Sequence, residues 1–75
     1  MGSRKAVTWR SPEGAPVSCV EKIKVLEQNL AEFRAVARDL LEDAVLMGCD
    51  PAQVRRILRD EVDGIDIGIL PRQME

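Results

Sequence analysis

The sequence predicts a small all-α protein in which a long helix folds back on a shorter one as an antiparallel helical hairpin. Two observations carry this prediction. Apolar residues recur every three or four positions through a long central stretch, and Gly48 followed by Asp50 and Pro51 marks the end of one helix and the start of another. A 75-residue chain buries only about 60% of its unfolded surface when it folds alone, so one domain with a marginal core is expected.

Residues 1–17 are predicted to form an irregular N-terminal arm, because glycines and prolines interrupt this stretch and no helical or strand period is sustained. Trp9 lies in the arm next to Arg10. Two interpretations of Trp9 stay open at this point. It anchors the arm to a partner, or it packs over the end of the helices.

The first helix is predicted over residues 18–47. Ser18 and Glu21 have the spacing of a capping box, in which each side chain accepts a hydrogen bond from a backbone N–H at the helix start. The apolar residues then form one stripe typical of a coiled-coil seam. The part of the seam expected to bind other chains comprises Cys19, Ile23, Leu26, Leu30, Phe33, Ala37 and Leu40.

A turn over residues 48–50 and a second helix over 51–63 complete the predicted hairpin, residues 18–64. Asp50 can cap this helix, Pro51 suits its first position, and Gly64 offers a stop. The residues expected to pack the two helices together are Val45, Met47, Val54, Ile57, Leu58 and Val62. Residues 65–75 follow as an apolar tail whose alternation from Ile65 to Pro71 favours either docking on a partner's sheet edge or folding back.

Helix lengths predict self-association. At about 1.5 Å per residue, the first helix is roughly 45 Å long and the second roughly 20 Å, so the second covers only half of the first. Soluble proteins rarely leave such an apolar strip bare over several turns. We therefore expect a homo-oligomer, a dimer or a tetramer, with a four-helix bundle as the simplest closed assembly.

An acidic cluster near the end of the first helix has two interpretations. The favoured one is structural: Asp39 and Asp43 form ion pairs with Arg55 and Arg59 across the hairpin. The other is a weak cation site that includes Cys49. With no histidine in the chain, no recognised metal set is complete, and neither a metal nor another cofactor is predicted.

Composition argues against several classes of protein. No nucleophile with a base and no acid and base pair stand out, so the sequence predicts no enzyme. Two cysteines are too few for a secreted disulfide framework, which favours the cytoplasm; Cys49 is either a turn residue or a reactive thiol. No stretch is apolar enough to span a membrane, and a net charge of −2 makes nucleic acid an unfavoured partner.

The stretch from Glu21 to Leu30 and the turn region from Leu40 to Asp50 resemble a family of short Rop-like proteins encoded in nitrogen-fixation gene clusters. The resemblance covers about three-fifths of the chain, residues 19–63, and is most specific around the turn. It implies a hairpin that assembles into bundles, and an accessory role toward nitrogenase or the assembly of its cofactor. It supplies no catalytic or binding residue.

The sequence therefore predicts a non-enzymatic helical interaction protein that acts with a nitrogenase-related partner. The alternative function is RNA binding by a Rop-like bundle. That function needs basic and aromatic residues on one exposed face, whereas the first helix mixes Lys24 and Arg38 with Glu27 and Glu42.

Overall fold

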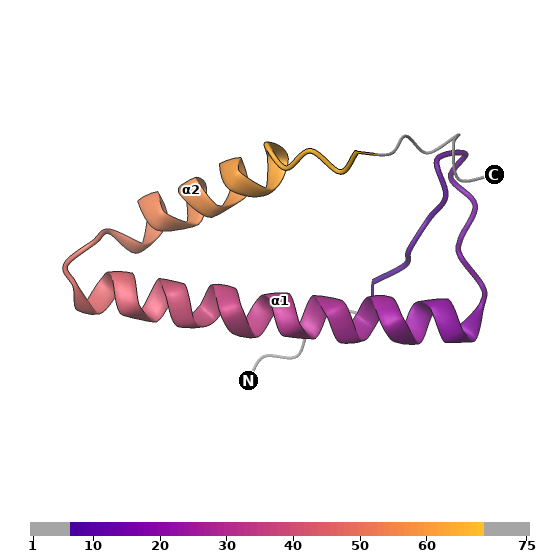
Figure 1. Cartoon of the computed structure of the whole chain (residues 1–75), viewed down its shortest axis with the longest axis horizontal. Helices are drawn as coiled ribbons and strands as arrows, with labels where there is room; N and C mark the ends of the chain where they lie inside the picture. Colours follow the sequence, from indigo (N-terminus) through magenta and orange to yellow (C-terminus); the bar gives the residue numbers. More distant parts are fainter. Residues whose placement is uncertain (1–6, 69–75) are drawn as a thin grey trace.

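The computed structural model describes residues 7–68 and confirms the all-α hairpin. Helix α1 spans Val20–Leu46 and helix α2 spans Pro51–Asp63. The two helices run antiparallel, and Figure 1 shows them nearest each other at the connecting turn and farther apart toward the end of α2. Within the described range, neither helix is long and apolar enough to cross a membrane.

The turn between the helices forms as its sequence predicts. Gly48 has a φ of 99°, in the left-handed region that favours glycine. The Gly48 N–H donates to the Val45 carbonyl at 3.0 Å, and the Cys49 N–H donates to the Ala44 carbonyl at 2.9 Å. These two bonds define a Schellman motif, which satisfies carbonyls left unpaired at the end of α1.

The start of α2 also follows its sequence signals. The Asp50 side chain accepts a hydrogen bond from the Gln53 backbone N–H at 3.0 Å, and Pro51 occupies the first helical turn. Gly64 lies at the C-cap, where the helix was predicted to stop, but its φ of −89° is right-handed. The helix therefore ends at Gly64, as predicted, without a left-handed backbone at this residue.

The predicted capping box at the start of α1 is wrong. The N-cap residue is Cys19, which makes no side-chain capping bond, and the helix begins at Val20 rather than at residue 18. The Val17 N–H donates instead to the Trp9 carbonyl at 2.7 Å, so the chain before α1 is tied to the arm. The local Ser18 and Glu21 pattern therefore does not mark the start of α1.

The described part of the arm, from residue 7, is a small loop rather than a featureless segment. Arg10 and Pro16 form an antiparallel bridge, and between them the Gly14 N–H donates to the Ser11 carbonyl at 2.9 Å. The Arg10 guanidinium closes the same loop by donating to the Gly14 carbonyl at 2.8 Å. The loop returns the chain toward α1 (Figure 1).

The core of the chain is minimal. Val54 on α2, 5% exposed, is the one residue among 7–68 that is buried. Ala37, Leu41 and Ala44 on α1 and Leu58 on α2 are half-buried. The contact between α1 and α2 thus leaves most apolar side chains of both helices partly or largely exposed.

Candidate functional site

The residues predicted to bind other chains differ in exposure along α1. The arm reaches the N-terminal half of α1, where the Trp9 indole Nε1 donates to the Glu27 carboxylate at 2.7 Å. Ile23 and Leu26 are half-buried in this half of the helix. Trp9 was expected either to anchor the arm to a partner or to pack over the end of the helices. In the structure its side chain is hydrogen-bonded to α1 of its own chain. The arm is therefore held against this half of α1 by the bond between Trp9 and Glu27.

Cys19, the first residue of the predicted seam, is a free, exposed thiol at the start of α1. Cys49 is likewise free and exposed in the turn. Among the described residues, no three histidine, cysteine, aspartate or glutamate side chains gather closely enough to hold a metal ion. The acidic residues near Cys49 thus form no ligand set with it in this part of the chain.

The ion pairs predicted across the hairpin are not formed. Among residues 7–68, the carboxylate that pairs with an arginine within 4.0 Å is Glu42, which accepts from Arg38 at 3.1 Å on the same helix. Asp39 and Asp43 lie two residues before and after Leu41, which turns them far from the side of α1 that faces α2. The Arg38 and Glu42 side chains are 77% and 58% exposed, so their pair contributes little stability.

Part of the predicted seam lines a groove between α1 and α2. Two adjoining hollows share Phe33, Ala37, Leu41 and Arg55, and so form one continuous groove. We call this surface the arginine-rimmed groove. Its floor is apolar and consists of Leu30, Phe33, Ala37, Leu41, Leu58 and Val62.

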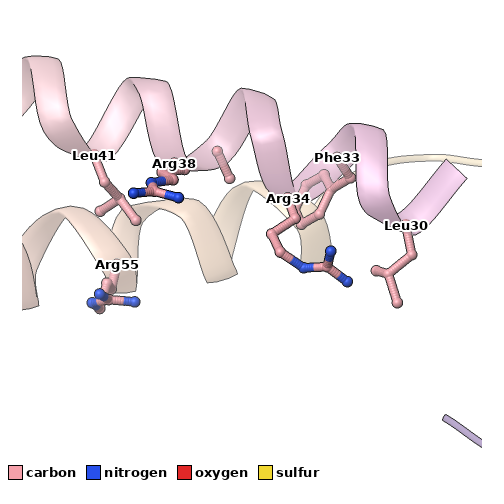
Figure 2. A pocket seen from close by; sticks show the side chains of 7 residues that line it. Leu30, Phe33, Arg34, Arg38, Leu41 and Arg55 are labelled. Atoms are coloured by element: carbon pink, nitrogen blue, oxygen red, sulfur yellow. The ribbon is translucent and has the colours of Figure 1, made fainter. Parts of the chain in front are cut away.

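The rim of this groove is strongly basic. Arg34 and Arg38 line it from α1, and Arg55 and Arg59 line it from α2. Figure 2 shows Arg34 and Arg38 beside the apolar side chains of α1. Arg55, which belongs to α2, lies opposite Leu41 of α1. The one carboxylate among the lining residues is Asp63. The groove thus presents positive charge although the chain carries a net charge of −2.

A second apolar surface lies on the outside of α1. Val36, Leu40 and Met47 are spaced by four and seven residues, which places them on one helical face, and they are 69%, 44% and 82% exposed. We call these three residues the outer stripe. Met47 was expected to pack within the hairpin, but its exposure places it on this stripe instead. Leu40 is the predicted interface residue that the stripe retains.

The remaining predicted packing residues divide in the same way. Val54 and Leu58 pack within the hairpin, whereas Val45, Ile57 and Val62 are each close to half exposed. Sequence reasoning did not assign Arg34 and Arg38 to a site. Arginines spaced four residues apart occur once on each helix, Arg34 with Arg38 and Arg55 with Arg59, and this repetition is the signal that predicts a shared basic face.

The C-terminal segment that the structure describes, residues 64–68, forms no strand. The Gly68 N–H donates to the Asp66 side chain at 3.0 Å, and Ile65 and Ile67 are exposed. The predicted apolar run continues beyond residue 68, outside the described residues. Comparison with known proteins yields no significant match to a family model, to a curated protein or to a solved structure.

Proposed function

We propose that this protein is a non-enzymatic helical interaction module that acts by assembling with other chains, including copies of itself. One observation carries the proposal. A single residue of the described chain, Val54, is buried, while large apolar side chains along both helices stay exposed. Small domains with so little core usually depend on association, a metal or disulfides for stability, and both cysteines here are free.

We propose the outer stripe as the surface of self-association. Val36, Leu40 and Met47 offer an apolar face along α1 and its C-cap, with the exposed carboxylate of Asp43 beside it, and pairing α1 with α1 of a second copy would cover this face. The assembly that these features support is a dimer, giving a bundle of four helices. The two free cysteines are compatible with a reducing compartment, and we propose a cytoplasmic location.

The test is the mass of the purified chain and of two variants by light scattering. We expect the natural protein to have a multiple of the 8.4 kDa chain mass. Leu40→Lys places a charge in the proposed contact and should weaken self-association by at least about tenfold. Leu46→Lys is the matched control, because Leu46 lies on the same helix, is 85% exposed and is not part of the stripe. A natural protein that stays at one chain mass at millimolar concentration would refute the proposal.

The identity of a protein partner rests on the resemblance to Rop-like proteins of nitrogen-fixation clusters. We propose that the partner belongs to nitrogenase or to the assembly of its cofactor. An affinity capture from an extract of nitrogen-fixing cells tests this, with the Leu40→Lys variant run in parallel. Recovery of a nitrogenase or cofactor-assembly protein supports the role, and recovery of neither contradicts it without affecting the self-association proposal.

A further inference from the structure

The arginine-rimmed groove differs from the outer stripe in its charge. Its apolar floor lies between two helices; Ala37, Leu41 and Leu58 on this floor are half-buried, whereas Phe33 and Val62 are exposed. Four exposed arginines flank this floor, of which Arg38 is paired with Glu42 on the same helix, and Asp63 is the one carboxylate that lines the groove. An occupant that fits must therefore supply apolar side chains for the floor and negative charge for the rim.

We propose that the arginine-rimmed groove binds an acidic amphipathic helix of a different protein. The proposal rests on the proposed function, since it names the chemistry of one partner of the interaction module. A third helix laid between α1 and α2 would place its apolar side chains on the floor and its Glu or Asp side chains beside Arg34 and Arg59. Guanidinium groups form strong, often bidentate hydrogen bonds with carboxylates, which makes arginine well suited to this rim.

A helix fits this groove better than other occupants. An extended peptide would bring unpaired backbone N–H and C=O groups over the apolar floor, and leaving them unsatisfied is costly. A helix satisfies its own backbone hydrogen bonds and offers only side chains. A free phosphate would contact the arginines but would leave Leu30, Phe33 and Leu58 uncovered.

A second copy of the chain fits the groove poorly. Two-fold pairing of groove with groove would set the arginine rims of both copies against each other, and like charges at close range oppose association. The three residues of the outer stripe are themselves uncharged, and the charged side chain of the same helical face is Asp43, not an arginine. The two surfaces therefore suit different partners, a second copy on the stripe and an acidic helix in the groove.

Binding of a designed peptide to the full chain tests the proposal by fluorescence anisotropy. The probe is a labelled helical peptide of about 18 residues, long enough to follow α2, with leucine on one face and glutamate on its flanks. A second peptide carries lysine in place of each glutamate. We expect the acidic peptide to bind, the basic peptide to bind at least about tenfold more weakly, and the affinity of the acidic peptide to fall as salt rises.

Charge reversal locates the binding surface. Arg34→Glu together with Arg59→Glu should weaken the affinity of the chain for the acidic peptide by about tenfold or more. The matched control is Arg56→Glu, because Arg56 is an exposed arginine of α2 that does not line the groove. If the double reversal alters the helical content, Arg34→Ala with Arg59→Ala replaces it, since both side chains are exposed and their truncation costs little.

Several outcomes overturn the proposal: equal binding of both peptides, undiminished binding by the double variant, or displacement of the acidic peptide by an RNA hairpin that binds the chain more tightly. Failure of the groove is distinguishable from failure of self-association. The Arg34 and Arg59 variants should keep the mass of the natural protein, whereas Leu40→Lys should reduce that mass and still bind the acidic peptide.

Discussion

Gly48 is the residue whose backbone most directly fixes the hairpin. Its φ of 99° is a conformation that other residues adopt at a cost of roughly 1–2 kcal/mol, and no atom lies within 4 Å of the place where a Cβ would stand. We therefore expect Gly48→Ala to lower the free energy of unfolding by about 1 kcal/mol through backbone strain alone. Urea unfolding followed by circular dichroism, at one fixed protein concentration, measures the change.

Gly64 provides the matched control for that substitution. It caps α2 with a right-handed φ of −89°, and a Cβ there would meet the Asp60 and Glu61 carbonyl oxygens at 3.5 and 3.8 Å, which is ordinary contact. Gly64→Ala should leave the free energy of unfolding unchanged or raise it by a few tenths of a kcal/mol, because alanine has fewer backbone conformations than glycine in the unfolded chain. Equal losses in both variants would mean that the left-handed turn at Gly48 does not end α1.

The hydrogen bond between Trp9 and Glu27 joins the arm to α1, so removing it should release the arm. Glu27→Ala removes the acceptor of the indole N–H, which lies 2.7 Å from the carboxylate. We expect the arm to detach, with a loss of stability of about 1 kcal/mol, because the bond involves a charged acceptor but is only partly buried. Trp9 is the one tryptophan of the chain, so its emission should shift to longer wavelength and become easier to quench.

Glu32→Ala is the control for this measurement, since Glu32 is an exposed carboxylate of the same helix. Its tryptophan emission should match that of the natural protein. An unchanged emission spectrum in Glu27→Ala would show that the arm does not depend on this bond.

Elements whose signals are local could be predicted from the sequence. The turn at Gly48 and the cap at Asp50 form within a few residues, and each depends on backbone chemistry that the residue types reveal. The start of α1 could not be predicted in this way. The Trp9 bond to Glu27 connects positions 18 residues apart, and the Val17 bond to the Trp9 carbonyl lies within the irregular arm; helical periodicity carries no information about either bond.

The candidate site shows the same limit. Periodicity placed Leu30, Phe33, Ala37 and Leu40 on one seam, but it cannot say which of them α2 borders. The structure assigns the first three to the groove and leaves Leu40 on the outer stripe. The ion pairs of Asp39 and Asp43 with Arg55 and Arg59 were expected because these residues lie at similar positions along the hairpin axis. They do not form, because that position says nothing about the direction in which each side chain points around its helix.

At the scale of the whole molecule, stability and assembly should be inseparable. Val54 is the one buried residue among those described, so covering the outer stripe in the proposed dimer should add to the stability of the chain, because binding between folded copies stabilises them by mass action. We expect the thermal midpoint of the natural protein to rise by roughly 5 °C for each tenfold increase in concentration, as judged by circular dichroism.

Two variants connect this dependence to a surface. Leu40→Lys should lower the midpoint and make it nearly independent of concentration, because the charged ammonium cannot be buried against a second copy without a partner. Leu46→Lys should keep the slope of the natural protein, since its 85% exposed side chain lies off the stripe and a cation near the end of α1 suits the helix dipole. A midpoint that is constant over a hundredfold range in the natural protein would instead mean that the hairpin and its arm are stable alone, with the outer stripe left free for another protein.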